Sequence, residues 1–292
     1  MAPEIYRAIV DGILIGGVYA LMAVGLTLIF GVLDIINIAQ GVLVILGAYL
    51  SYSLFTKAHI DVFIGLLITV PVMFVIGVVM YWAFIRRLRG TERTSMTLLV
   101  TYAVALIIEG ILYKIYGAGV DQINASYTTS TVHIFGFYLP YIYIYGFILA
   151  VALVIGLYAL LYRTRFGRSV RATMQDVTAA RLVGIDVNRV AAITFGVGVA
   201  VTAAGGMMFG ATNSFNPNSG YDLISRLLAI IILGGLGSVG GALGAAVFMI
   251  TLESVVTIWY PTWAVVVFYA ALVLVLVVRP TGFFGQKAVR AQ

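Results

Sequence analysis

The chain has 292 residues, of which 62% are hydrophobic and only 10% are charged, and its mean hydropathy is +1.10. Soluble domains are about half apolar and carry about 25% charged residues, so the composition excludes a soluble protein and indicates one polytopic membrane domain over residues 1–292. The net charge of +6 comes with no soluble basic domain to bind nucleic acid, and the absence of cysteine excludes disulfides and thiolate metal sites.

Apolar runs along the chain predict its membrane-spanning helices. A helix needs about 20 apolar residues to cross a hydrocarbon core about 30 Å thick. The fold class is therefore all-α, with eight or nine spanning helices at 8–31, 41–56, 62–85, 95–116, 141–162, 190–212, 225–237, 241–259 and 263–279. The runs 41–56 and 225–237 are short, so these two helices are expected to be tilted, half-spanning or broken.

The distribution of Lys and Arg predicts the orientation, because cytoplasmic loops are enriched in these residues. With nine spans, one side holds only Arg7, Lys57, Lys114 and Arg226. The other side holds Arg86, Arg87, Arg89, Arg93, Arg163, Arg165, Arg168, Arg171, Arg181, Arg189, Arg279, Lys287 and Arg290. We therefore expect a bacterial plasma (inner) membrane protein with the N-terminus outside, the C-terminus in the cytoplasm, and lipids around its spans.

The longest cytoplasmic loop, about 163–189, contains the polar segment RATMQDVTAARLVGID. Ser169 is a candidate N-cap and Gly184 a candidate stop, so the sequence predicts one short helix between them. Val170, Met174 and Val177 recur at helical spacing and are expected to form an apolar ridge. Such a helix suits either an interfacial anchor or a docking site for another protein.

Sequence motifs for catalysis are missing, so we do not expect an enzyme. A phosphate-binding loop requires a lysine after glycine, and none of the three lysines follows one. Ser238, within the glycine-rich run GGLGSVGGALG, would need a base to act as a hydrolase nucleophile. The only histidines, His59 and His133, fall in predicted outer loops, and they are too few for a metal site.

Acidic residues within predicted spans keep an ion-coupled transporter open as an alternative. Glu109 and Glu253 lie inside or near the ends of spans, where an ionisable group is costly and invites a function. The competing interpretation is that each carboxylate forms a hydrogen bond with a neighbouring helix.

Four stretches together resemble the permease subunits of branched-chain amino acid ABC importers. These are GLTLIFGVLDIINIAQGVLVILGAYL (25–50), the cytoplasmic RATMQDVTAARLVGID, GGLGSVGGALGA (234–245) and RPTGFFG (279–285). Many members of that family have Asn-Phe-Ala-His-Gly where this chain has Asn37-Ile38-Ala39-Gln40-Gly41. The resemblance implies import of a branched-chain or other hydrophobic amino acid, with urea, short amides or another small polar solute as alternatives.

The resemblance also implies the partners. Cytoplasmic ATP-binding subunits would carry ATP and Mg²⁺, with no cofactor on this chain. A second permease, more plausibly different than identical, and an external solute-binding protein would complete the importer. The cytoplasmic loop would then be a coupling helix, with Ala179-Ala180 and Gly184 as its core. The ATPase-coupling residues would be Arg171, Gln175, Asp176, Thr178, Ala179, Ala180, Leu182 and Gly184.

Two stretches are candidates for the substrate path. The polar break at 34–40 is either a broken helix that exposes backbone groups to cargo or a plain cytoplasmic turn. The glycines of 234–244 fit close helix packing or a cargo site. The candidate residues are Asn37, Gln40, Gly41, Gly235, Gly237 and Ser238. Because specificity is expected to reside mainly in the binding protein, tight cargo binding by this chain is not expected.

Overall fold

The structure is a computed structural model that describes residues 2–88, 93–134 and 137–284. Within these residues, eight helices are long and apolar enough to cross a membrane, which confirms the lower of the two predicted counts. They are α1 (Ala2–Leu33), α2 (Gln40–Ala58), α3 (Val62–Ala83), α4 (Arg93–Tyr116), α6 (Tyr141–Arg163), α9 (Val187–Thr212), α11 (Val239–Trp259) and α12 (Pro261–Val278). Arg89, Lys287 and Arg290, counted in the charge pattern, lie outside the described residues.

Shorter elements connect these helices. They are η1 (Ile85–Arg87), α5 (Ser126–Thr129), β1 (Thr131–Ile134), β2 (Phe137–Pro140), α7 (Arg165–Gln175), α8 (Val177–Leu182), η2 (Pro217–Ser219) and α10 (Gly220–Gly234). The antiparallel hairpin β1–β2 was not predicted. The predicted run 225–237 corresponds to α10, which begins and ends earlier and has only 15 residues.

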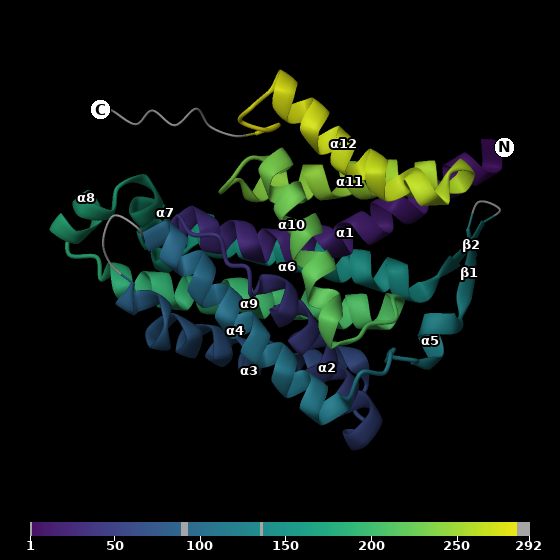
Figure 1. Cartoon of the computed structure of the whole chain (residues 1–292), viewed down its shortest axis with the longest axis horizontal. Coiled ribbons are helices and arrows are strands. Elements are labelled where there is room, and N and C mark those ends of the chain that lie inside the picture. The colour runs from purple at the N-terminus through teal and green to yellow at the C-terminus, as the bar shows by residue number, and fades with distance from the viewer. Residues whose placement is uncertain (1, 89–92, 135–136, 285–292) are drawn as a thin grey trace.

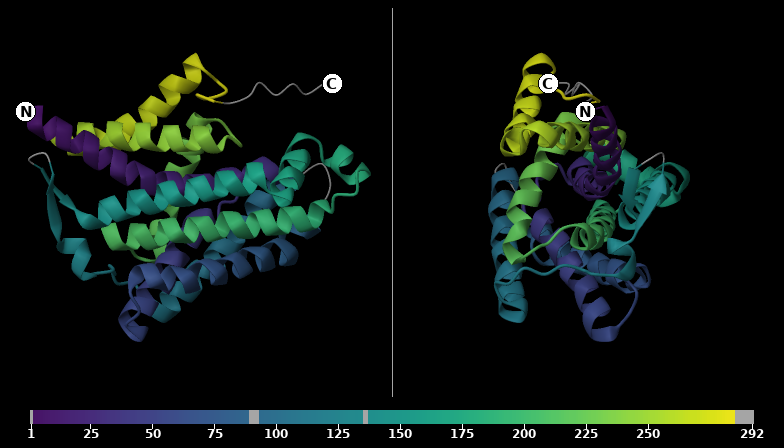
Figure 2. Two further views of the ribbon diagram at one scale, coloured as in Figure 1. Left: turned by 180° about the vertical axis from the view of Figure 1, so that it is seen from behind. Right: turned by 90° about the vertical axis from the view of Figure 1, so that its right-hand side faces the viewer.

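Two mostly buried helices, α1 and α9, form the centre of the bundle. They pack against each other; α11 and α6 also cover α1, whereas α2 and α3 cover α9. Helix α12 lies on the outside against α11 and is mostly exposed, as expected for a helix facing lipid. Figures 1 and 2 show α11 and α12 on one side of this centre and α3 and α4 on the other.

The bundle has two distinct ends. The start of α1 and the hairpin β1–β2 lie at one end, and α8 lies at the other (Figure 1). At the hairpin end, Asp121 and Phe215 exchange two backbone hydrogen bonds of 2.9 Å, which join the loops after α4 and α9. The Phe215 ring lies 4.8 Å from the Tyr49 ring in an edge-on contact. These contacts fix the loop that leads into α10.

A second contact at the hairpin end involves Asp61. Its Oδ1 accepts a hydrogen bond from the Phe63 amide at 2.9 Å and so caps α3. Its Oδ2 accepts a hydrogen bond from the Tyr127 hydroxyl at 3.0 Å. Burial, assisted by this carboxylate, raises the pKa of Tyr127, so the hydroxyl stays protonated and remains a donor at neutral pH.

Glycine allows the short helices α2 and α10 to meet inside the bundle. A Cβ on Gly41 would overlap the carbonyl oxygen of Gly220 and lie 2.9 Å from the Ile224 Cβ. The first turns of α2 and α10 are therefore in backbone contact. In Figure 1, α10 runs across the long helices rather than along them. Its other end is held by the C-terminal segment, because the Phe283 amide donates to the Leu233 carbonyl at 2.7 Å.

Candidate functional site

The polar segment around RATMQDVTAARLVGID forms two helices, so the prediction of one helix starting at Ser169 was wrong. Thr164 begins α7, because its Oγ1 accepts a hydrogen bond from the Gly167 amide at 2.9 Å. Asp176 ends α7 and caps α8, accepting from the amides of Thr178 at 2.7 Å and Ala179 at 3.0 Å. A side chain that satisfies free amides competes with continuing the helix through it, which explains the break.

Gly184 ends α8, as predicted. Its φ of +83° is in the left-handed region that favours glycine. The Gly184 amide donates to Arg181 O and the Ile185 amide to Ala180 O, both at 3.0 Å, which satisfies the last carbonyls of the helix. The predicted ridge is not continuous: Val170 is buried, whereas Met174 and Val177 are exposed, because the helix axis changes at Asp176.

The predicted coupling residues divide by exposure. Ala180 is buried and Arg171 is held by α6, since its Nη1 donates to Leu161 O at 2.5 Å and its guanidinium lies over the Tyr162 ring. The others are exposed: Gln175, Asp176, Thr178, Ala179, Leu182 and Gly184. Leu182 is 84% exposed and the adjacent Val183 is 75% exposed. The tip of α8 therefore presents apolar side chains that nothing in the described chain covers.

The polar break at 34–40 begins at the exposed Asp34 and then enters the protein, which does not fit a plain surface turn. Asn37 and Gln40 are fully buried. Asn37 Nδ2 donates to Gln40 Oε1 at 2.8 Å, and Gln40 Nε2 donates to the Thr202 hydroxyl in the middle of α9. These bonds satisfy the Asn37 Nδ2 and both polar atoms of the Gln40 side chain, which would be costly to bury alone, and they tie the start of α2 to the core. Asn37 Oδ1 is buried without a hydrogen-bond partner among the described residues.

The second predicted set, Gly235, Gly237 and Ser238, forms the turn between α10 and α11. Both glycines have positive φ, +95° and +82°, and Ser238 Oγ accepts a hydrogen bond from the Gly241 amide at 3.1 Å, which caps α11. A Cβ on Gly234 would lie 2.5 Å from the Gly241 carbonyl carbon, so close packing is confirmed there. Gly41 contacts the start of α10, whereas the turn at 235–238 follows the end of α10. The two groups of predicted path residues therefore lie at opposite ends of this helix.

A polar cavity of about 430 Å³ lies away from both groups of predicted path residues, between α1, α10, α11 and the loop that follows α9. This volume falls in the range of small-molecule sites. Its lining residues are Ile15, Tyr19, Phe209, Asn213, Ser214, Ser219, Asp222, Leu223, Arg226, Ile250, Glu253, Ser254 and Thr257. None of the six predicted path residues is among them.

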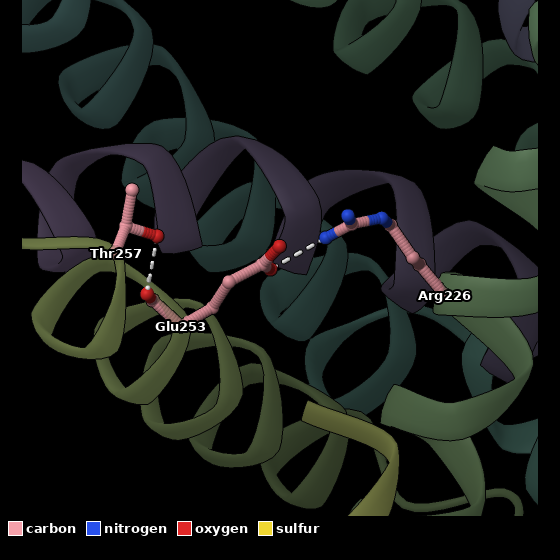
Figure 3. A network of polar contacts seen from close by, with 3 residues as sticks. All are labelled: Arg226, Glu253 and Thr257. Carbon is pink, nitrogen blue, oxygen red and sulfur yellow. Dashed lines mark hydrogen bonds and ion pairs between the residues drawn. The ribbon is translucent and has the colours of Figure 1, made fainter. Parts of the chain in front are cut away.

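An ion pair crosses this cavity from α10 to α11. Arg226 Nη1 lies 2.5 Å from Glu253 Oε2, and the Thr257 hydroxyl donates to the Glu253 carbonyl oxygen at 2.7 Å (Figure 3). The Arg226 guanidinium also lies 5.4 Å from the centre of the Phe268 ring of α12. Arg226, which was counted with the few charges of the predicted outer side, lies within α10, because this helix begins at Gly220.

Glu109 contacts the same helix from another direction. Its Oε2 accepts a hydrogen bond from the Tyr221 hydroxyl at 2.7 Å. The interpretation of Glu109 and Glu253 as hydrogen-bonding groups between helices is thus confirmed for both.

The other residues that line the cavity were not predicted as a site. Asp222 and Arg226 could have indicated one, because two charges spaced four apart beside an apolar run lie on the same face of a helix. Within the described residues, no three His, Asp or Glu side chains gather as a metal site.

The chain is similar to known transport proteins along its whole length. It is 27% identical over 313 residues to the high-affinity branched-chain amino acid transport system permease protein BraD of Pseudomonas aeruginosa, covering 98% of this chain and 99% of the relative. It is 27% identical to the permease protein LivH of Escherichia coli K12, covering 96% and 95%. It is 35% identical over 141 residues to the autoinducer 2 import system permease protein LsrC of Klebsiella pneumoniae, covering 46% and 41%.

No solved structure gives a significant match to the chain. The family model described as "Branched-chain amino acid transport system / permease component" matches residues 8–276, which include all eight candidate spans except the first and last few residues. The chain therefore belongs to the family of branched-chain amino acid transport system permease components.

Proposed function

We propose that the chain is one of two membrane-spanning subunits of an ATP-driven importer for a small amino acid, with a branched-chain amino acid as the first candidate. Family membership and full-length similarity to BraD and LivH support this cargo. The observation that carries the proposal is the exposed tip of α8, with Leu182 and Val183 uncovered at the end of the bundle opposite the hairpin. Exposed apolar patches of this kind mark protein interfaces.

The partner at α8 is a cytoplasmic ATP-binding subunit. Leu182 and Val183 would enter an apolar groove of that subunit, and the exposed Ala179 would allow close approach. ATP and Mg²⁺ would bind there, with no cofactor on this chain. Movement of the docked helix would then tilt the spans and open the cavity alternately to each side. The bacterial plasma membrane is the proposed location, with α8 and the C-terminus in the cytoplasm and the N-terminus outside.

Two further partners are proposed. Polar residues exposed on α10, Asp222 and Ser225, cannot face lipid without cost, so this face is proposed to border the path shared with a second, related but different permease chain. The loops at the hairpin end, joined through Asp121 and Phe215, would receive a solute-binding protein. Specificity would then be divided between that protein and the membrane subunits.

A different small polar solute is the second candidate cargo. The similarity to LsrC over 46% of the chain supports it, as does Gln40 in place of the family's usual histidine. Urea and short amides are further examples. An uptake assay in competition with these solutes separates them from leucine.

Isolation from the native membrane tests the class of transporter. Gentle solubilisation is expected to retain an ATP-binding subunit and a second permease with this chain. Liposomes containing that complex, with binding protein outside and ATP inside, are expected to accumulate leucine. A chain that purifies alone, or leucine uptake driven by a proton gradient without ATP, would contradict the proposal.

Labelling of single cysteines tests the orientation. The chain contains no cysteine, so Val120→Cys and Val183→Cys each introduce one thiol at a side chain that is 67% or 75% exposed. A maleimide that cannot cross membranes is expected to label Val120→Cys in spheroplasts, and Val183→Cys only after lysis. The reverse pattern would invert the proposed topology.

A further inference from the structure

The polar cavity lies toward the hairpin end of the bundle. Its rim includes Asn213 and Ser214, which directly follow α9. They neighbour Phe215, whose backbone is bonded to Asp121 in the other loop at this end. The cavity reaches Ile15 and Tyr19 in the middle of α1. It therefore leads from the end proposed to face outward to the centre of the spans. Of its lining residues, only Glu253 was named from the sequence as a candidate functional group.

The cavity is lined by charged side chains of both signs, namely Asp222, Arg226 and Glu253. Asp222 and Arg226 are four residues apart on α10 and therefore lie on one face of the helix. Glu253 faces Arg226 from α11, at 2.5 Å. The side chains of Arg226 and Glu253 are largely buried, being 21% and 17% exposed, whereas Asp222 is exposed. The cavity is thus lined by one cation and two carboxylates, and it carries a net negative charge.

The bonding of Arg226 leaves capacity for a second carboxylate. A guanidinium has five N–H donors in a planar fork, and Glu253 contacts the Nη1 end of it (Figure 3). Arg226 neutralises the Glu253 carboxylate, which leaves the Asp222 carboxylate as an additional negative charge. A ligand that brings one carboxylate and one ammonium therefore complements the cavity without changing its net charge.

The remaining wall is suited to a short aliphatic side chain. Ile15, Leu223 and Ile250 line the cavity together with Phe209, and all of these except Ile15 are buried residues of the core that expose only a small apolar surface. Burial of a four-carbon side chain against such a wall is favourable because it removes apolar surface from water. The hydroxyls of Ser219, Ser254 and Thr257 complete the polar half.

We infer that this cavity is a transient binding site for the zwitterion of an aliphatic α-amino acid. Arg226 binds the α-carboxylate, Asp222 and Glu253 bind the α-ammonium, and the apolar wall accommodates the side chain. The inference rests on the proposed function and names the residues through which this chain meets its cargo. Arg226 already has a partner in Glu253, so the carboxylate of the cargo must share the guanidinium with it. This competition keeps the affinity low enough for the cargo to leave the cavity and continue across the membrane.

Uptake by liposomes that contain the complete transporter tests the site. The binding protein, loaded with radiolabelled leucine, is supplied outside and ATP inside, and uptake is divided by the ATP hydrolysed. Asp222→Asn removes an exposed carboxylate without leaving a buried charge unpaired, so the variant is expected to fold normally. Its uptake per ATP is expected to fall at least fivefold, since charge-assisted hydrogen bonds to the ammonium are lost.

Arg226 is tested as a pair with Glu253. Arg226→Gln alone leaves Glu253 unpaired in the spans and can reduce folding, whereas Arg226→Gln/Glu253→Gln leaves two neutral amides of similar size that can bond to each other. The double variant is expected to be made in normal amounts, to hydrolyse ATP within twofold of wild type, and to take up leucine at least tenfold less per ATP. A purely structural ion pair predicts that the double variant recovers normal uptake.

Glu109→Gln is the matched control. It also removes a carboxylate that contacts α10, through Tyr221, but Glu109 does not line the cavity. Its uptake per ATP is expected to stay within twofold of wild type. Normal uptake by Asp222→Asn or by the double variant would overturn the inference and leave the proposed function intact. Wild-type liposomes without ATP-dependent leucine uptake would instead overturn the proposed function.

Discussion

Replacing Gly41 with valine is expected to abolish accumulation of the folded chain. The added Cβ would overlap the carbonyl oxygen of Gly220 and press on the backbone nitrogen of Ile224, 2.9 Å away. Backbone atoms of a packed helix cannot rotate aside as a long side chain can, so the cost lies at the upper end of overpacking, about 3 kcal/mol or more. The measurement is the monodisperse fraction and the melting temperature of the detergent-solubilised protein.

Gly156→Val supplies the control for this prediction. Gly156 lies on the exposed side of α6, and a Cβ there meets nothing within 4 Å. The variant is expected to accumulate and melt like wild type. Equal behaviour of the two valine variants would show that α2 and α10 do not meet closely at Gly41 and Gly220.

Replacing Leu182 with aspartate is expected to weaken association with the ATP-binding subunit by at least about 100-fold while leaving the membrane domain folded. Leu182 is 84% exposed and contributes little to the fold of the chain itself. In the proposed complex it is an apolar anchor, and a carboxylate in its place would have to lose its hydration without a partner. That penalty amounts to about 3 kcal/mol, which corresponds to roughly 100-fold in the dissociation constant.

Co-purification and ATPase activity of the reconstituted complex measure this effect. Arg189→Ala is the control, because Arg189 is also highly exposed at this end and pairs locally with Asp186 at 2.9 Å. It is expected to leave association unchanged. Normal association of Leu182→Asp would show that α8 is not the docking site.

The sequence predicted the long helices well because a hydrocarbon core imposes a length and a composition on each span. Prediction was less accurate for α10, which begins at Gly220 rather than 225. Hydropathy alone excluded residues 220–224, where Asp222 interrupts the apolar run, although the predicted run did include the second charge of this helix, Arg226. Those charges are tolerated because Glu253 and a polar cavity receive them, and neither is local in sequence.

The predicted site was partly located and partly missed. The helical character of the polar segment 171–186 and its end at Gly184 were recognised, whereas the break at Asp176 was not, although aspartate is a strong capping residue. Asn37 and Gln40 are buried, and Gln40 is bonded to Thr202, 162 residues further along the chain, a contact that no local pattern contains. The cavity combines residues from α1, α10 and α11, so it could be found only from the assembled bundle.

The short α10 also constrains how the chain is made. Its 15 residues rise about 22 Å, less than the thickness of a bilayer core. Arg226 would cost about 3 kcal/mol at the centre of an isolated helix. Its partner Glu253 is 27 residues further along the chain and leaves the ribosome later. We therefore expect insertion of α10 to be complete only once α11 has emerged, and a nascent chain that stops between them to carry an unneutralised cation.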